Sequence, residues 1–106
     1  MPELKDNPQL KDYQLYVNEL EKERGFETDS SKDKCLLLGE EVGELFQVVR
    51  KADGLGIDPQ SKVNELEGEL ADIFIYLCSI ANRFDINLEK AFLKKEEKNK
   101  ERIWIK

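Results

Sequence analysis

The chain has 106 residues, of which 17 are Lys or Arg and 23 are Asp or Glu, so its formal net charge is -6 at pH 7. This length fits a single domain, and the acidic balance argues against nucleic acid or an anionic membrane as the main partner, because both attract basic surfaces. Histidine is absent, which disfavours histidine acid–base chemistry, histidine-containing zinc sites and Glu-x-x-His di-iron sites. Any metal ion would therefore be held by oxygen atoms.

Three features bear on the cellular location. The N-terminal stretch from Met1 to Asp6 is polar and acidic, so we expect no signal peptide. The longest nearly uncharged apolar run, residues 73–82, is about half as long as a membrane span. Cys35 and Cys78 both fall in apolar stretches, where a reduced, buried thiol is expected. We therefore expect a cytoplasmic protein that binds no membrane.

Apolar residues recur at spacings of three and four, and no long stretch alternates with period two, which predicts an all-α chain. The first helix is expected over residues 8–24, with Asn7 as N-cap, Pro8 at the first helical position and Gly25 at the end. A polar connection follows, in which Phe26 stands alone as an aromatic residue. Phe26 would either cover the core beside the helix end or contact a ligand, and the sequence leaves both open.

The second helix is expected over residues 32–52 and the third over residues 60–84, with a loop or bend at Gly54, Gly56 and Pro59. Each carries an unbroken apolar stripe: Cys35, Leu38, Val42, Leu45, Val49 and Ala52 in the second helix, and Val63, Leu66, Leu70, Ile73, Leu77, Ile80 and Phe84 in the third. Such stripes are typical of adjacent helices in a bundle. Because a short connection joins these two helices, we expect them to be antiparallel neighbours.

The third helix is apolar nearly all round between residues 70 and 81. A helix of this kind must be covered on every side, and a domain of this size has difficulty covering it alone. We therefore expect a homo-oligomer that buries this segment between subunits.

The fourth helix is expected over residues 88–102, with Asn87 as N-cap. Its first turns can pack, whereas its end is almost entirely charged. Trp104 follows close to the C-terminus and is expected to dock on the body of the protein or on another subunit. The whole chain, 1–106, is interpreted as one four-helix bundle-type domain with antiparallel central helices.

Acidic side chains form a row on the flank of each central helix. At about 100° per residue, Glu41 and Glu44 lie beside the apolar stripe of the second helix, with Glu40 further toward its polar side. Glu69 and Asp72 lie beside the stripe of the third helix. Antiparallel packing would bring the two rows together in a half-dry groove, where Mg²⁺ or Mn²⁺ would neutralise them. Glu-x-x-Glu spacings are also common on solvated helix surfaces, so the pattern alone leaves a metal site and an acidic surface open.

Several motifs in the same order resemble the MazG family of nucleoside triphosphate pyrophosphohydrolases. They are Leu38-Gly39-Glu40-Glu41-Val42-Gly43-Glu44-Leu45, Glu69-Leu70-Ala71-Asp72-Ile73, Asp85-Ile86-Asn87-Leu88-Glu89-Lys90-Ala91 and Lys95-x-x-Lys98-Asn99-x-x-Arg102. The resemblance runs from about Leu37 to Arg102. It implies an all-α fold, a homodimer or homotetramer, Mg²⁺ bound by an E-x-x-E and an E-x-x-D pair, and hydrolysis of a nucleoside triphosphate to the monophosphate and pyrophosphate. The first helix matches least, and in this family that end helps to form the base pocket.

The resemblance also assigns roles to residues. Glu41 and Glu44 match the first metal-binding pair, and Glu69 and Asp72 match the second. Mg²⁺ held there would grip phosphate oxygens and lower the pKa of a bound water, which Glu40 is the candidate to orient. Phosphate contacts are assigned to one face of the fourth helix, at Lys95, Lys98, Asn99 and Arg102.

Two other functions stay open. The chain could be a non-catalytic helical oligomerisation or interaction module whose acidic rows are surface, or a family member that binds nucleotide without hydrolysing it. Saturable binding of Mg²⁺ or Mn²⁺ would separate the enzyme from the interaction module. Pyrophosphate release would separate it from the inactive binder.

Overall fold

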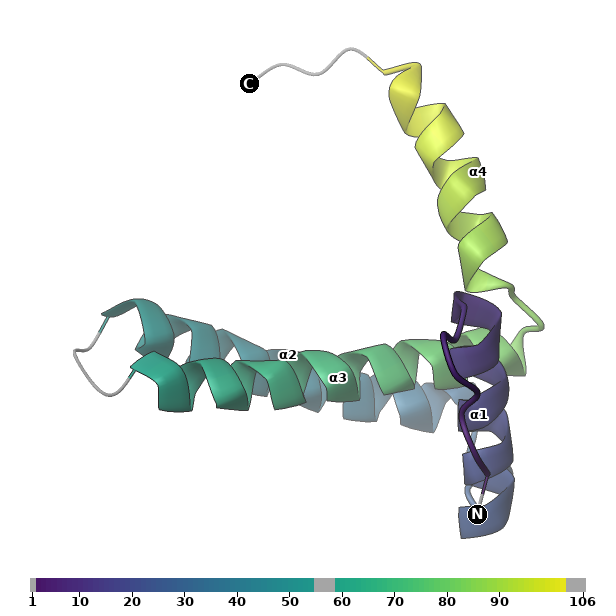
Figure 1. Ribbon diagram of the computed structural model, residues 1–106, viewed down its shortest axis with the longest axis horizontal. Helices are drawn as coiled ribbons and strands as arrows, with labels where there is room; N and C mark the ends of the chain where they lie inside the picture. Colours follow the sequence, from purple (N-terminus) through teal and green to yellow (C-terminus); the bar gives the residue numbers. More distant parts are fainter. Residues whose placement is uncertain (1, 55–58, 103–106) are drawn as a thin grey trace.

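The structure is a computed structural model that describes residues 2–54 and 59–102, with the side chains of these ranges outside 52–64 (Figure 1). The described residues form four α-helices and no strand: α1 (Leu10–Arg24), α2 (Ser31–Gly54), α3 (Pro59–Arg83) and α4 (Leu88–Lys100). The prediction of an all-α chain is confirmed. The expected bend between the central helices lies largely outside the described residues, and the expected docking of Trp104 lies wholly outside them.

The N-terminus of α1 corrects one prediction, because Gln9 and not Asn7 is the N-cap. The Gln9 backbone N–H donates to Asp12 Oδ2 at 2.7 Å. A residue before proline is disfavoured in the right-handed helical region, and Asn7, which precedes Pro8, adopts a φ of 52°. The helix therefore starts after the proline. At its other end Gly25 has a φ of 77° and terminates the helix as predicted.

α2 and α3 lie side by side and antiparallel, and they make the most extensive helix contact of the described structure (Figure 1). The start of α2 is fixed by a reciprocal pair, in which Asp33 N–H donates to Ser30 Oγ at 3.1 Å and Ser30 N–H donates to Asp33 Oδ2 at 3.3 Å. This pairing satisfies backbone donors that a helix terminus otherwise leaves free. The pair therefore fixes where α2 begins.

α1 crosses one end of the α2–α3 pair, and α4 leaves the same corner and points away from the pair (Figure 1). Asn87 is the N-cap of α4 as predicted, and its Oδ1 accepts from Lys90 N–H at 3.0 Å. Within one chain α4 packs against α1 but not along α2 or α3. The four helices therefore do not close into a bundle in a single chain.

Gln14 joins α1 to the turn between α3 and α4. Its Nε2 donates to Ile86 O at 2.8 Å and to Asn82 Oδ1 at 3.2 Å, and its Oε1 accepts from Leu88 N–H at 2.9 Å. The Asn82 side-chain amide donates back to Gln14 O at 2.8 Å. One buried amide thus fixes the direction in which α4 leaves the corner.

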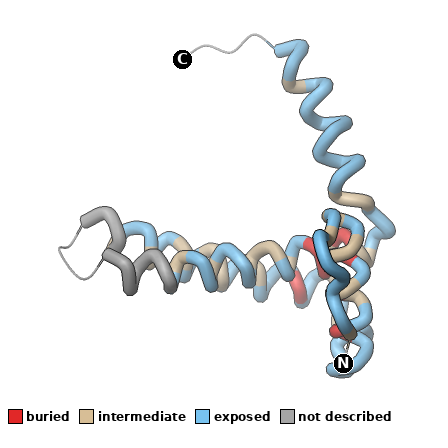
Figure 2. Tube along the Cα trace, in the orientation of Figure 1, coloured by how far each residue is buried: buried red, intermediate tan, exposed pale blue. Residues whose placement is uncertain are grey.

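The buried apolar core among the described side chains is small, and it gathers where α1 crosses α3 (Figure 2). Its members are Val17, Leu20, Cys78 and Ala81. Cys78 is buried as predicted, whereas the prediction of burial was wrong for Cys35, which is exposed. Leu70 and Leu77 of the predicted stripe are also largely exposed. The sequence pattern shows which faces of a helix are apolar but not which of them another helix covers. Among the described residues α2 makes its extensive contact with α3, so the apolar faces of the two helices that point away from this contact stay exposed to solvent in one chain.

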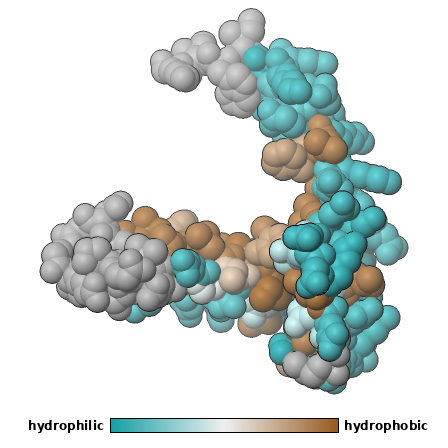
Figure 3. Space-filling model, viewed as in Figure 1, coloured by the Kyte–Doolittle hydropathy of each residue, from teal (hydrophilic) through white to brown (hydrophobic). Residues whose placement is uncertain are grey.

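Large apolar side chains on α3 and α4 therefore remain at the surface. Figure 3 shows hydrophobic surface along the α2–α3 pair and on the part of α4 nearest to it. An apolar groove of about 610 Å³ is formed by α3, the first turns of α4 and the start of α1, and it is lined by Leu10, Phe74, Leu77, Leu88, Glu89, Ala91, Phe92 and Leu93. In the described ranges, none of the helices combines the length and the apolar character that a membrane crossing needs.

Candidate functional site

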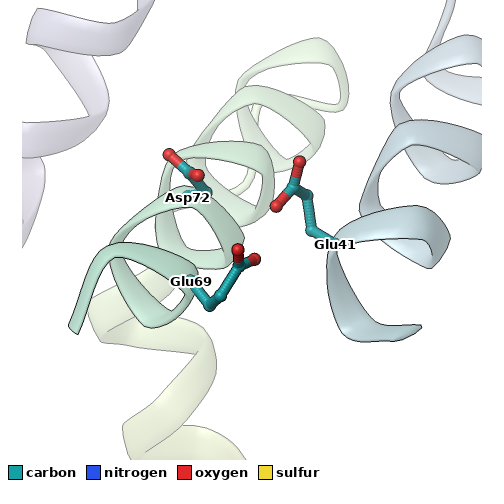
Figure 4. Close-up of side chains that lie close together, drawn as sticks. All are labelled: Glu41, Glu69 and Asp72. Carbon is teal, nitrogen blue, oxygen red and sulfur yellow. The ribbon is translucent and has the colours of Figure 1, made fainter. Parts of the chain in front are cut away.

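Three carboxylates converge between the central helices. Glu41 comes from α2, and Glu69 and Asp72 come from α3, where their i, i+3 spacing places both on one face. One carboxylate oxygen of each lies within 4.8 Å of the others (Figure 4). The structure therefore brings together three of the four side chains that the sequence assigned to a metal ion.

The three carboxylates repel one another, and two of their oxygens are buried without a hydrogen-bond partner. Glu41 Oε2 and Glu69 Oε2 are buried, and neither has a hydrogen-bond partner. The adjacent Glu69 carboxylate, which accepts a hydrogen bond only from a protonated Glu41, raises the pKa of Glu41 to about 7, together with burial and the charges of Glu44, Glu69 and Asp72. Glu41 therefore holds its proton to a higher pH than an ordinary glutamate does.

The donor set fits a hard divalent cation. It consists of carboxylate oxygens from Glu41, Glu69 and Asp72, with no histidine or cysteine among them. Mg²⁺ and Mn²⁺ prefer such oxygen ligands, whereas zinc and copper favour nitrogen and sulfur. A cation would also give Glu41 Oε2 and Glu69 Oε2 the partner that the protein does not provide.

Glu44 and Glu40 lie at the edge of the group. Glu44 is exposed and does not belong to the set of oxygens within 4.8 Å, although its negative charge helps to raise the pKa of Glu41. Glu40 is also exposed, and burial together with the charges of Glu41, Asp72 and Glu40 raises the pKa of Tyr76. Both side chains are therefore near the site without being inside it.

Lys95, Lys98 and Asn99 of the predicted phosphate-binding set are on α4, and Arg102 follows just after its end. α4 points away from the α2–α3 pair (Figure 1), which carries the carboxylates. Lys95, Lys98 and Arg102 are exposed, and Asn99 is half-buried. None of these four residues lines the cavity beside the carboxylate group. Within one chain the structure does not bring them to the site.

A cavity of about 260 Å³ adjoins the carboxylates. Glu41 and Asp72 form part of its wall, and the rest comes from α1, the α1–α2 connection, the start of α2 and further turns of α3: Val17, Leu20, Glu21, Arg24, Phe26, Lys34, Ile75, Tyr76 and Ser79. Phe26, for which the sequence left two roles open, is 46% exposed and lies in this wall. Val17 and Leu20 of the core line the same cavity.

The sequence missed a charged network behind this wall. The Arg83 guanidinium pairs with the Glu21 carboxylate at 2.7 Å, and Lys34 Nζ lies 3.3 Å from Asp29 Oδ2 and 4.0 Å from Glu21 Oε2. Burial would raise the pKa of Glu21, but the hydrogen bonds from Arg83 and Ser79 and the charges of Arg83 and Lys34 lower it below its ordinary value. One signal was available, because Arg83 is the only charged residue between positions 73 and 84. A charge in such a stretch requires a partner.

Comparison with known proteins adds an independent result. The model of the MazG nucleotide pyrophosphohydrolase domain matches residues 29–103. No significant match was found among curated proteins. The matched range contains α2, α3, α4 and all three converging carboxylates, whereas α1 lies outside it. Since the match covers well over half of the chain, the protein belongs to the MazG nucleotide pyrophosphohydrolase family, as the motifs indicated.

Proposed function

We propose that the protein is a Mg²⁺-dependent pyrophosphohydrolase that converts a nucleoside or deoxynucleoside triphosphate to the monophosphate and pyrophosphate. One observation carries this proposal: two buried carboxylate oxygens, Glu41 Oε2 and Glu69 Oε2, have no hydrogen-bond partner in a group that adjoins a cavity. A bound cation would offset the cost of keeping these charges out of water. Mn²⁺ has the same ligand preference and would replace Mg²⁺.

The residues divide the work by position. Glu41, Glu69 and Asp72 hold the cation, and the exposed Glu44 side chain turns inward from the edge to join them. Bound Mg²⁺ would supply the positive charge that a triphosphate needs in an acidic groove and would lower the pKa of a bound water. Glu40 accepts a hydrogen bond from the attacking water and orients it.

The reaction follows from these contacts. The water oxygen bonds to the α-phosphorus, the bond from that phosphorus to the bridging oxygen breaks, and pyrophosphate leaves with the electron pair while a proton passes to solvent. The nucleoside part extends into the cavity, where Phe26 and Tyr76 offer aromatic rings and Ile75 offers an apolar wall. A cation held by Glu41, Glu69 and Asp72 would attract the phosphates to the carboxylate end.

The test is a panel of nucleoside and deoxynucleoside triphosphates incubated with Mg²⁺, with pyrophosphate release as the readout. Glu41→Gln and Asp72→Asn should abolish release while far-UV circular dichroism stays that of the folded helices. Glu67→Gln removes an exposed carboxylate from α3, the helix that carries Asp72. It is the matched control and should retain activity. Unchanged turnover in both site variants would refute the assignment.

The same samples address the two alternatives. An interaction module should bind neither Mg²⁺ nor Mn²⁺ saturably in calorimetry, and its melting temperature should not rise with the cation. A nucleotide-binding relative without turnover should bind cation and nucleotide but release no pyrophosphate. Either result would replace the proposed function.

We further propose that the working site is assembled from two copies of the chain in a homodimer or a homotetramer. The radius of gyration is 16.6 Å, whereas a compact chain of this length is expected near 13 Å. The accessible surface is 8272 Å², whereas a compact protein of this mass exposes about 6,100 Å². This excess is of the size that a stable subunit interface buries.

The partner copy would also supply the phosphate contacts. Among the described residues α4 packs mainly on α1 within its own chain, and the groove between α3 and α4 is almost wholly apolar. A second copy seated in this groove would cover Phe92 and Leu93, which are largely exposed. It would bring Lys95 and Lys98 of one copy to the carboxylates of the other.

Subunit complementation tests the shared site. Glu41→Gln and Lys98→Ala chains, each inactive alone, are mixed, unfolded and refolded together. If one site uses carboxylates from one chain and α4 from another, random pairing restores about a quarter of the wild-type sites in a dimer. No recovery above the separate variants would mean that each chain uses its own α4.

A further inference from the structure

Arg83, at the last position of α3, uses its guanidinium group to tie α3 to α1 and to the connection between α1 and α2. Its Nε donates to Asp29 O at 2.8 Å, and its Nη2 donates to Phe26 O at 2.9 Å. Both Nη atoms also donate to the Glu21 carboxylate, at 3.3 and 2.7 Å. Nη1 donates further to Ser79 O at 3.0 Å and to Ser79 Oγ at 2.7 Å. A planar fork can make this set of bonds, whereas a single ammonium cannot.

These bonds tie to α3 a short segment whose other backbone bonds are local: Phe26 N–H donates to Glu21 O at 2.8 Å, and Asp29 N–H donates to Phe26 O at 3.1 Å. Phe26 and the residues that follow it lie between two helices and are mostly exposed. Arg83 holds two of the backbone carbonyls, at Phe26 and Asp29. Lys34, which is only 6% exposed, adds an ion pair with Asp29 and places Nζ 5.0 Å from the centre of the Phe26 ring. The position of the Phe26 ring therefore depends on Arg83 and Lys34 together.

Phe26 lies beside Lys34, about two turns of α2 from Glu41, so the segment is at the other end of the cavity from the carboxylates on α2 and α3. Phe26 and Lys34 share this cavity with Glu41 and Asp72, but Arg83 does not line it. Under the proposed function, on which this step rests, the carboxylate end takes the phosphates. The Phe26 end is then left for the nucleoside, and an aromatic ring there offers a stacking face to any base.

We propose that Arg83 is a positioning residue for base recognition: it never touches the substrate, and it holds Phe26 as a preformed wall against which the base stacks. The ring needs no ordering when nucleotide binds, because its loop is already tied to α3. Preorganisation of this kind raises affinity by removing the cost of ordering. Phe26 is the residue that contacts the base, and Arg83 acts through it.

The test compares a nucleotide with a ligand that has phosphates but no base. Binding of a nucleoside triphosphate and of inorganic tripolyphosphate is measured by calorimetry in Mn²⁺, for wild type, Arg83→Lys and Phe26→Ala. Both variants should weaken nucleotide binding roughly 10-fold, the loss expected for one stacked base, and should leave tripolyphosphate affinity within about two-fold, since the phosphate end is untouched. In turnover, KM should rise while kcat changes little.

Two further variants show whether Arg83 acts through Phe26. The double variant with Arg83→Lys and Phe26→Ala should bind nucleotide no more weakly than Phe26→Ala alone, because the wall is already lost. Phe26→Tyr keeps an aromatic ring and should restore nucleotide binding. Far-UV circular dichroism and the melting temperature check that Arg83→Lys is folded. If Arg83→Lys does not fold, the Phe26 variants still test the wall, because Phe26 is half exposed and its replacement should leave the fold intact.

Three results would overturn the proposal. Equal weakening of nucleotide and tripolyphosphate would make Arg83 a purely structural residue. Unchanged nucleotide affinity in Phe26→Ala would mean that the ring is not part of the base site. Additive losses in the double variant would mean that Arg83 does not act through Phe26. Failure of the proposed function would be a separate result: the wild type would bind both nucleotide and tripolyphosphate but release no pyrophosphate. In that case the effect of the variants on nucleotide binding would still test the role of Phe26 and Arg83.

Discussion

The carboxyl group of Glu41 destabilises the folded chain at neutral pH as long as no cation lies beside it. Its folded-state pKa is about 7, against 4.5 for an ordinary glutamate, because the adjacent Glu69 accepts a hydrogen bond only from the protonated form, because the group is partly buried, and because negative charges surround it. The folded state thus holds this proton more tightly than the unfolded state. Its contribution to stability is fully present below pH 4.5 and is lost as the pH rises to 7.

The first prediction concerns this loss. In a chelator, the free energy of unfolding of the wild type should fall between pH 4.5 and pH 7 relative to that of Glu41→Gln, which has no such group to titrate. Urea unfolding at four or five pH values measures both. Glu21 does not interfere, because its lowered pKa means that its contribution is lost only as the pH falls below the ordinary range. A difference between the two proteins that does not change with pH would contradict this account.

The two thiols give a second prediction. Cys35 is exposed, whereas Cys78 is fully buried and its pKa is raised to about 11 by burial. Because the thiolate is the reactive form, a thiol reagent at pH 8 should modify one cysteine quickly and the second only on unfolding. Cys35→Ser should remove the fast phase, and Cys78→Ser should remove the slow one. Two fast phases in the wild type would show that α1 does not cover Cys78 in solution.

At the scale of the helices, the sequence predicted what local periodicity determines. The convergence of Glu41, Glu69 and Asp72 could be predicted because each lies beside an apolar stripe whose spacing sets its direction. The pairing of Glu21 with Arg83 was not found, because the two residues are 62 positions apart and meet only through the angle at which α1 crosses α3. Local sequence is enough to predict where a helix forms. Which face of the helix is covered depends on residues far away in the sequence.

The hydrogen bonds of Gln14, which join α1 to the turn between α3 and α4, give a prediction about stability. Gln14→Leu keeps the size of the side chain but leaves Ile86 O and Leu88 N–H without their partner. The free energy of unfolding should fall by about 2–3 kcal/mol, the range for buried polar groups left unpaired. Asn18→Ala, one turn along the same helix and on the same surface hollow, is the control and should change it by at most about 0.5 kcal/mol. An equal loss in both variants would mean that the corner is not held by the Gln14 bonds.

At the scale of the whole molecule, the described core is too small for the apolar surface that the helices carry. Four buried apolar side chains lie at one corner, while residues such as Phe46 and Phe92 remain about two-thirds exposed. The sequence predicted this conflict, since the third helix is apolar nearly all round between residues 70 and 81. It could not show which faces the other helices of the same chain would leave uncovered.

A substitution in the apolar groove tests the proposed assembly. Phe92→Glu should lower the molar mass in sedimentation, because a charge buried between subunits without a partner is strongly unfavourable. It should also lower pyrophosphate release and spare Mn²⁺ binding, which each chain performs with its own carboxylates. Lys94→Gln changes the net charge by the same amount on the exposed side of α4 and should leave the mass unchanged. An unaltered mass for Phe92→Glu would place the interface elsewhere.

If a divalent cation binds beside the partnerless oxygens of Glu41 and Glu69, as proposed, the turnover of the chain would also depend on the supply of that cation. A cation that binds the folded form and not the unfolded one lowers the population of open chains by mass action. Proteases cleave those open chains, so the rate of degradation follows their population when opening and closing are fast. A protein of this design would accumulate where its cation is plentiful and be removed where the cation is scarce, without any separate regulator.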